Sequence, residues 1–129
     1  MMTTKWGRWE NPPDIRRTTD RTGREVALLL QNLVWIRADG TTVVIPAGFV
    51  CDGATVPRVV WSLVGGPFDG PYLPGAILHD FLLSVRTPGQ PVWGIHKEFY
   101  NGMRANNTSW LISNLFYRSV QTYSLVTLR

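Results

Sequence analysis

The first half of the chain carries short apolar runs that are typical of β-strands. Residues 33–37 and residues 41–45 are both rich in β-branched and aromatic side chains. Between them stand Asp39 and Gly40, a pair that is a strong short hairpin signal. Residues 25–31 are also apolar, although their composition alone would fit a helix as well. We therefore predict a small antiparallel sheet of about three strands.

The second half is predicted to be helical, with start and stop signals around each segment. Pro57, Pro74 and Pro91 each suit the first turn of a helix, where a missing N–H group is not needed. Thr108 is a good N-cap for a last helix. The expected helices are residues 57–64, 74–86, 91–104 and 109–123. Because strands come first and helices follow with short connections, we predict an α+β fold with three or four helices packed on the small sheet.

One domain is expected to account for most of the chain. We predict that residues 25–129 form a single α+β domain and that residues 1–24 form an N-terminal arm. Trp6 and Trp9 lie in this otherwise polar arm, where they either fold back on the domain or dock onto a neighbour. The last expected helix is apolar nearly all round, which is typical of a central helix or of one covered by another subunit. Trp6, Trp9 and Trp110 are therefore the predicted interface residues.

Composition and charge exclude several classes of protein. The net charge is +4, but the basic residues between positions 5 and 25 are interleaved with acidic ones, so nucleic acid is not an expected partner. No stretch approaches the roughly 20 apolar residues of a membrane span, and residues 1–5 lack the apolar core of a signal peptide. Cys51 is the only cysteine, which excludes an intrachain disulfide. We expect a soluble product made in a cytoplasm, with Cys51 as a core residue.

Four ionisable side chains on apolar elements are candidates for chemistry. Asp52 lies in a glycine turn, His79 and Asp80 lie in an apolar helix, and His96 lies on the apolar face of the next helix. Such groups are costly to bury unless they are paired, bound to a ligand or used in catalysis. Asp52, His79 and His96 suit a divalent metal ion with an open position. The metal-free alternative is acid–base catalysis by His79 with Asp80 and Asp52.

Each of these residues also has a purely structural interpretation. A histidine in an apolar helix is often a core residue bonded to a backbone carbonyl, and an Asp before Gly is common turn chemistry that caps a following helix. Consecutive residues project about 100° apart on a helix, so His79 and Asp80 cannot both face one point. We expect one of them to act at a site and the other to anchor a neighbouring turn.

The motifs together resemble a small family found mainly in phage and prophage genomes, the domain of unknown function family 1353. Its pattern joins an Ile-Pro-Ala-Gly-Phe strand, an Asp-Gly-Ala-Ser-Val-Pro turn, a Tyr-Leu-Pro lead and a His-Asp helix. These motifs correspond here to residues 45–49, 52–57, 72–74 and 79–80, and the resemblance covers roughly residues 25–123. Thr55 replaces the usual Ser, and His96 replaces the usual Asp of a later motif. The resemblance implies a phage source and carries over no activity.

Two functions follow as expectations. The first is a structural component of the virion, associated with the tail or neck, that docks onto other virion proteins or copies of itself through the Trp-bearing arm and the apolar C-terminal helix. There, Asp52 and His79 would tie the turn to the helix in the core. The alternative is a small phage hydrolase, acting on a cell-wall or lipid substrate through the His/Asp set with or without a metal ion. We favour the first.

Overall fold

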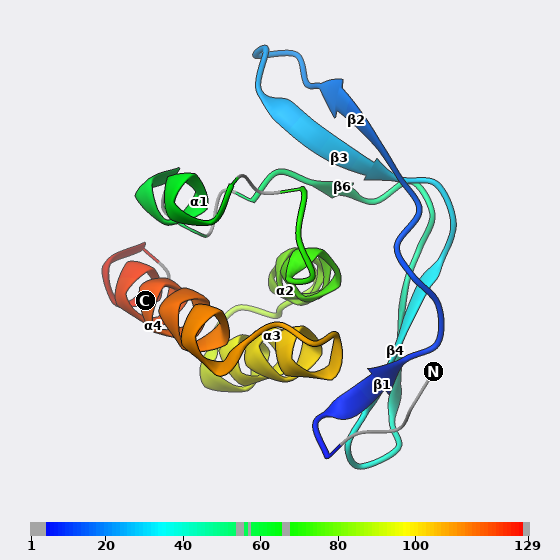
Figure 1. Ribbon diagram of the computed structural model, residues 1–129, viewed down its shortest axis with the longest axis vertical. Coiled ribbons are helices and arrows are strands. Elements are labelled where there is room, and N and C mark those ends of the chain that lie inside the picture. Colours follow the sequence, from blue (N-terminus) through cyan, green and yellow to red (C-terminus); the bar gives the residue numbers. More distant parts are fainter. Residues whose placement is uncertain (1–4, 54–55, 57, 66–67, 128–129) are drawn as a thin grey trace.

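The computed structural model describes residues 5–53, 56, 58–65 and 68–127 (Figure 1). The fold is α+β, as predicted: within the described residues, six strands in the N-terminal half precede four helices. The strands are β1 (Gly7–Trp9), β2 (Ile15–Thr19), β3 (Glu25–Leu29), β4 (Leu33–Arg37), β5 (Thr42–Ile45) and β6 (Val50–Cys51). The helices are α1 (Arg58–Val64), α2 (Leu73–Ser84), α3 (Trp93–Ala105) and α4 (Trp110–Thr127). Pro57 and Thr55, which the sequence singled out, lie outside the described residues.

The strands form two antiparallel sheets of three strands each, in place of the single sheet that we expected. Their orders are β1-β4-β5 and β2-β3-β6. The predicted hairpin is confirmed: β4 pairs with β5, and Gly40 in its turn has a φ of 92°, which favours glycine. The apolar segment at 25–31, which was ambiguous, contains the strand β3. Asn32 lies where the chain passes from one sheet to the other, and its side-chain oxygen accepts a hydrogen bond from Ala47 N (2.8 Å).

The described part of the expected N-terminal arm belongs to the two sheets. β1 pairs with β4, where Trp9 lies opposite Trp35, and β2 pairs with β3. Trp9 is only 2% exposed, and its Nε1–H donates to Gly102 O in α3 (2.9 Å). The boundary at residue 24 therefore does not separate an arm from the domain, and the predicted interface residue Trp9 is a core residue. A strand of three residues is too short to show a period, so its partner strand and α3 decide its place.

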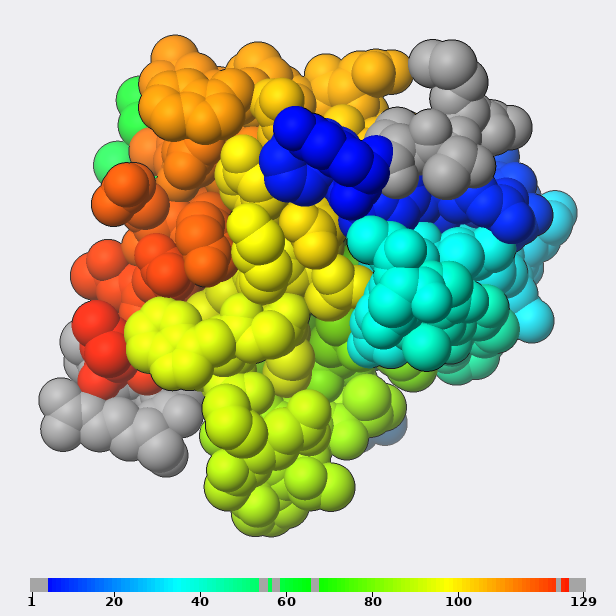
Figure 2. Space-filling view, turned by 90° about the horizontal axis from the view of Figure 1, so that it is seen from below, coloured from blue at the N-terminus to red at the C-terminus, as the bar shows by residue number. Residues whose placement is uncertain are grey.

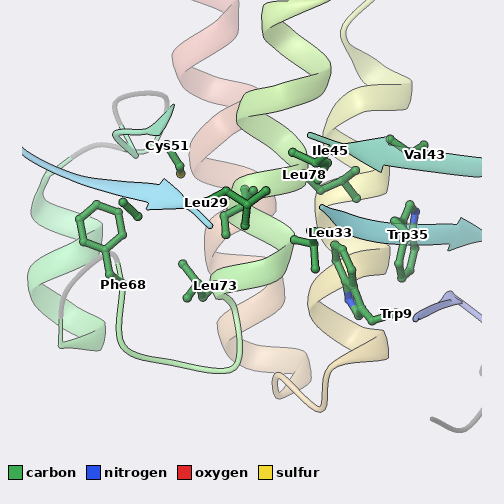
Figure 3. Close-up of a cluster of buried hydrophobic side chains, with 12 residues drawn as sticks. Trp9, Leu29, Leu33, Trp35, Val43, Ile45, Cys51, Phe68, Leu73 and Leu78 are labelled. Atoms are coloured by element: carbon green, nitrogen blue, oxygen red, sulfur yellow. The ribbon is translucent and has the colours of Figure 1, made fainter. Parts of the chain in front are cut away.

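Two apolar cores share α2. The first lies between the strands and α2, where Figure 3 shows Leu29, Ile45 and Leu78 gathered among strands and helix. The second lies among the four helices and contains the aromatic cluster of Trp61, Tyr72 and Phe116, whose ring centroids are 5.0 to 5.6 Å apart. All residues from 73 to 79 of α2 are buried. α2 is thus covered on opposite sides, and Figure 1 shows it in the middle of the molecule.

Glycines allow α2 and α3 to approach closely. A Cβ on Gly75 would lie 2.9 Å from Met103 Cγ, and one on Gly102 would lie 3.1 Å from Trp9 Cζ2 and 3.3 Å from the Gly75 Cα. His79 follows Gly75 by four residues and therefore lies on the same face of α2. This close approach helps to bring His79 within hydrogen-bond distance of α3.

The cap of the last helix differs from the prediction by one residue. Ser109 Oγ, directly before α4, accepts a hydrogen bond from Ile112 N (3.2 Å). The predicted cap, Thr108, is 3% exposed, and its Oγ1 has no hydrogen-bond partner among the described residues. Ser is preferred over Thr as an N-cap, so the observed cap agrees with the local preference of these two adjacent residues.

Candidate functional site

The two histidines of the chain meet in the interior of the helical half. His79 Nε2 of α2 lies 2.8 Å from His96 Nδ1 of α3, so the two rings share a hydrogen bond. His96 Nε2 in turn lies 3.0 Å from Ser124 Oγ near the end of α4. His79 also stacks on Phe99, with ring centroids 4.7 Å apart. Three helices are therefore joined by one polar chain, which runs from His79 through His96 to Ser124.

Burial controls the protonation of this chain. His79 and His96 are 1% and 0% exposed. Burial, and to a lesser extent the neighbouring His96, lowers the pKa of His79 from 6.5 to about 3. Burial also lowers the pKa of His96. Both imidazoles are consequently neutral at physiological pH.

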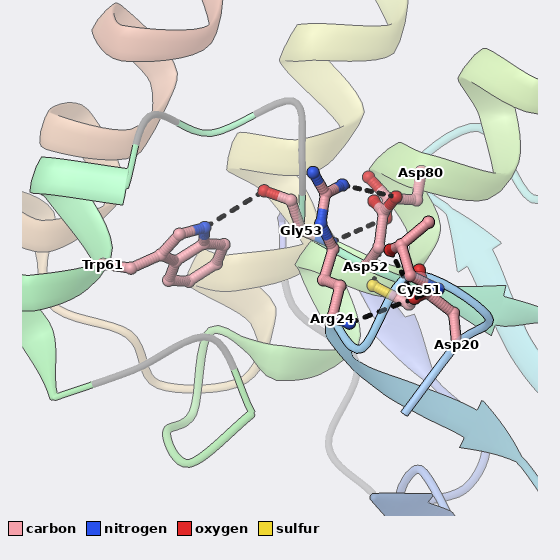
Figure 4. Close-up of polar contacts among 8 residues, drawn as sticks. Asp20, Arg24, Cys51, Asp52, Gly53, Trp61 and Asp80 are labelled. Carbon is pink, nitrogen blue, oxygen red and sulfur yellow. Dashed lines mark hydrogen bonds and ion pairs between the residues drawn. The ribbon is translucent and has the colours of Figure 1, made fainter. Parts of the chain in front are cut away.

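Asp80 projects from a different side of α2 than His79 and anchors the turn after β6. Its Oδ2 accepts hydrogen bonds from the Cys51 thiol (3.1 Å) and from Gly53 N (3.3 Å), as Figure 4 shows. Burial and the Asp80 carboxylate raise the pKa of Cys51 well above its usual range. Cys51 is therefore a protonated core thiol, as predicted. The divergence of His79 and Asp80 follows the angular argument, and Asp80 is the one that anchors the turn.

Asp52 lies on the outer side of this turn. Its Oδ2 forms an ion pair with Arg24 Nη1 of the β2–β3 hairpin (3.4 Å), and both side chains are about half exposed. Arg24 is positioned in turn by Asp20, whose Oδ1 accepts a hydrogen bond from Arg24 N (3.0 Å). An exposed ion pair of this kind contributes roughly 0–1 kcal/mol, so Asp52 adds little to fold stability through it.

The structure therefore brings together some of the predicted site residues and separates others. His79 and His96 are in direct contact, whereas Asp52 and Asp80 lie at the turn on another side of α2. In the described part of the chain, no three His, Cys, Asp or Glu side chains are grouped so that they could hold a metal ion. The predicted metal set of Asp52, His79 and His96 is thus not assembled there, because the facing nitrogens of the two histidines bond to each other.

Sequence reasoning missed one member of the polar chain. Ser124 is 4% exposed and lies 28 residues after its partner His96. Serine is common on helices, and only the packing of α4 against α3 indicates which serine meets a histidine. A partial signal was present, since a serine on the inner face of an otherwise apolar helix needs a polar partner.

The other predicted interface residues, Trp6 and Trp110, differ in exposure. Trp6 packs edge-on against Tyr100 with centroids 5.6 Å apart, and Lys5 Nζ lies 4.7 Å from its ring centroid. Trp110 is 63% exposed at the first turn of α4. Of the three predicted interface tryptophans, Trp110 is therefore the one with the largest exposed fraction.

Comparison with known proteins places this domain in a family. The family described as "Protein of unknown function (DUF1353)" matches residues 27–120. The chain belongs to this family. It is also 38% identical, over 79 residues, to the "Uncharacterized protein y4jT" of Sinorhizobium fredii (strain NBRC 101917 / NGR234).

The match to y4jT covers 61% of this chain and 23% of that protein, so the chain spans about a quarter of its relative. Neither the family description nor the name of the relative specifies an activity. No solved structure matches the chain. Within the described residues, no helix has both the length and the apolar character that a membrane crossing requires.

Proposed function

We propose that this protein is a structural component of a phage particle, located at the tail or neck, that docks onto other virion proteins or copies of itself. The observation that carries the proposal is a pair of large apolar side chains at the start of α4, Trp110 and Leu111, which are 63% and 68% exposed. We call these two residues the α4 docking surface. The phage origin rests on the motifs that the sequence shares with a family of phage and prophage genomes.

The exposed pair is unfavourable for an isolated chain. A tryptophan buries roughly 150–250 Å² when it is covered, and each Å² of apolar surface contributes about 25 cal/mol. Covering Trp110 and Leu111 would thus stabilise a complex by several kcal/mol before the cost of association. α1, which packs against α4 through Trp61 and Phe116, exposes Val59 and Leu63 by 66% and 70%. Figure 2 shows green side chains of α1 beside the orange first half of α4.

The polar residues of the interior fit a structural role as well. The bonds of Asp80 to the turn and of His79 to α3 fix elements against one another, as a building block requires. The hydrolase in which His79 is the general base gains less support, because His79 Nε2 faces the imidazole of His96 at 2.8 Å.

Particle incorporation tests the proposal. In the phage or prophage that encodes the chain, the double variant Trp110→Ser and Leu111→Ser should reduce the amount of the protein in purified particles, measured by quantitative mass spectrometry. The reduction should reach about tenfold or more, which corresponds to a loss of about 1.4 kcal/mol or more in docking free energy. The melting temperature should stay unchanged, because both side chains are exposed in the isolated chain.

Val85→Ser is the matched control, because Val85 is apolar, 56% exposed and located at the C-terminal end of α2. This variant should be incorporated like the wild type. Normal incorporation of the Trp110/Leu111 double variant would refute docking through the α4 surface.

A further inference from the structure

We propose that Ser124 is the nucleophile of an acyl-transfer centre that hydrolyses small carboxylic esters with an apolar acyl group. In this centre His96 is the general base and His79 is a positioning residue. The inference goes beyond the proposed docking role and does not depend on it. It also differs from the hydrolase expected from the sequence, because it uses neither Asp52 nor a metal ion.

The geometry has the arrangement of nucleophile, base and orienting group. Ser124 Oγ lies 3.0 Å from His96 Nε2, and His96 Nδ1 lies 2.8 Å from His79 Nε2. Both distances are within the range for direct proton transfer or a strong orienting hydrogen bond. The two nitrogens of His96 face Ser124 and His79 respectively. The base of a Ser-His-Asp triad likewise faces its nucleophile and its orienting group, which is a carboxylate there and an imidazole here.

The position of one proton decides whether Ser124 is activated. When His96 carries its proton on Nδ1, this N–H donates a hydrogen bond to His79 Nε2. His96 Nε2 is then an acceptor that faces the serine. The Ser124 hydroxyl has a second acceptor, Gln121 O of its own helix, at 2.9 Å. Rotation of this single hydroxyl proton from Gln121 O to His96 Nε2 is the activating step. His79 favours it by accepting a hydrogen bond from His96 Nδ1–H.

A surface pocket reaches the serine. Ser124 lines a pocket of about 450 Å³ between the start of α3 and the end of α4, within the size range of small-molecule sites. Its walls include the side chains of Trp93 and Leu125, which are 51% and 56% exposed, and this lining suits an apolar acyl group. Arg86 also lines it and adds a positive charge that favours developing negative charge on an ester oxygen. Figure 2 shows the yellow-green start of α3 beside the red end of α4 on one face.

The reaction follows from these positions. Ser124 Oγ attacks the ester carbonyl carbon while its proton passes to His96 Nε2. The bond between the carbonyl carbon and the alcohol oxygen then breaks, and the alcohol leaves with the proton from His96. A water molecule attacks the acyl-serine, gives its proton to His96, and the carboxylic acid is released as Ser124 Oγ recovers the proton.

A serine-reactive probe tests the proposal directly. Full-length protein is incubated with a fluorescent fluorophosphonate, which phosphonylates activated serines and releases fluoride. We expect one label per chain, mapped to Ser124 by peptide mass spectrometry, and hydrolysis of 4-nitrophenyl butyrate by the same protein. Ser124→Ala should abolish both signals.

Ser119→Ala is the matched control. Ser119 is also a serine of α4 and donates to a carbonyl three residues earlier, that of Phe116 (2.9 Å). Neither ring-nitrogen hydrogen bond of His96 involves Ser119. This variant should keep the labelling rate of the wild type. Labelling of Ser119 and Ser124 at equal rates, or no labelling of Ser124 in the folded wild type, would overturn the proposal.

Two further variants separate positioning from stability. His96→Asn removes the base and should reduce the rate of labelling by about 10²-fold or more. His79→Gln keeps a side-chain acceptor for His96 Nδ1–H and should retain most of the rate, whereas His79→Leu should lose it. The pH profile of labelling should change in His79→Leu, an effect that a merely structural residue would not produce in protein that remains folded.

The Trp110/Leu111 double variant should be labelled like the wild type, so failure of the docking role and failure of this centre are distinguishable.

Discussion

Two neutral imidazoles can share a hydrogen bond in a dry core only while one of the facing nitrogens lacks a proton. His79 and His96 satisfy this condition because burial lowers the pKa of both rings. Their 2.8 Å contact thus joins α2 to α3 at neutral pH and is lost when both rings are protonated. At the scale of single residues, the pair makes the fold sensitive to acid.

This sensitivity gives a prediction for stability against pH. An unfolded histidine has a pKa of about 6.5, while that of His79 in the folded chain is about 3. Between these pH values the unfolded chain binds a proton that the folded chain excludes. The free energy of unfolding should therefore fall as the pH falls below 6.5, by up to about 1.4 kcal/mol per pH unit for each buried histidine. Urea unfolding at pH 7.5 and pH 5.5 measures the difference.

His79→Gln provides the control, because the chain has only two histidines and this variant removes one of them. Its stability should depend less steeply on pH over the same interval. A wild-type free energy of unfolding that is equal at pH 7.5 and pH 5.5 would contradict the assignment of two neutral buried imidazoles.

At the scale of elements, α2 connects the parts of the fold. Its residue Asp80 holds the turn after β6, His79 holds α3, and Gly75 lets the α3 backbone approach. The contact between Gly75 and Gly102 is specific to small residues, because a Cβ at either position would enter occupied space. Intrinsic helix propensity and tertiary packing therefore oppose each other at these two glycines.

Alanine substitutions in α3 separate these two effects. Gly102→Ala should destabilise the protein by about 1–3 kcal/mol, since its Cβ would lie 3.1 Å from Trp9 Cζ2 and 3.3 Å from Gly75 Cα. Gly94→Ala in the same helix meets nothing within 4 Å and should stabilise it by about 0.5–1 kcal/mol through helix propensity. Chemical denaturation of both variants at pH 7.5 measures the two signs. Equal stabilisation by both substitutions would show that the helices do not pack closely at Gly102.

At the scale of the whole molecule, the N-terminal strand β1 connects the β1-β4-β5 sheet to α3. Trp9 donates to Gly102 O, a contact between residues 93 positions apart, and its ring centroid lies 4.7 Å from that of Trp35. The β1-β4-β5 sheet and α3 are thereby joined around the side chain of Trp9. β1 and β2 are paired into the two sheets, and we therefore expect them to unfold together with the rest of the described fold.

Two tryptophans test this connection. Trp9→Ala should cost about 3–5 kcal/mol of unfolding free energy, since it removes a buried aromatic ring. Trp93→Ala should change it by less than about 1 kcal/mol, because Trp93 is 51% exposed. Urea unfolding followed by far-UV circular dichroism compares the two variants. Similar small losses for both would place the N-terminal strand outside the cooperative unit.

The parts of the fold that the sequence predicted are those that depend on local signals such as turn, proline and capping residues. The β4–β5 hairpin follows from Asp39 and Gly40, and each described helix begins and ends within four residues of its predicted bounds. Proline, glycine and capping residues act on their immediate neighbours, so their effects can be read without knowing the fold. β1, β2 and β6 were missed, since short strands depend on distant partners for their hydrogen bonds.

The candidate site, like the fold, was predicted from the sequence in part. The sequence determined that His79 and Asp80 diverge on their helix and that an apolar setting forces each ionisable group to find a partner, because both follow from helix geometry and desolvation. Only the tertiary structure decided which partners they find: His96 for His79, with Ser124 bonded in turn to His96, and the turn after β6 for Asp80. These partners are 17 to 28 residues apart along the chain, and tertiary packing brings them together. The composition of one segment does not indicate which other segment packs against it.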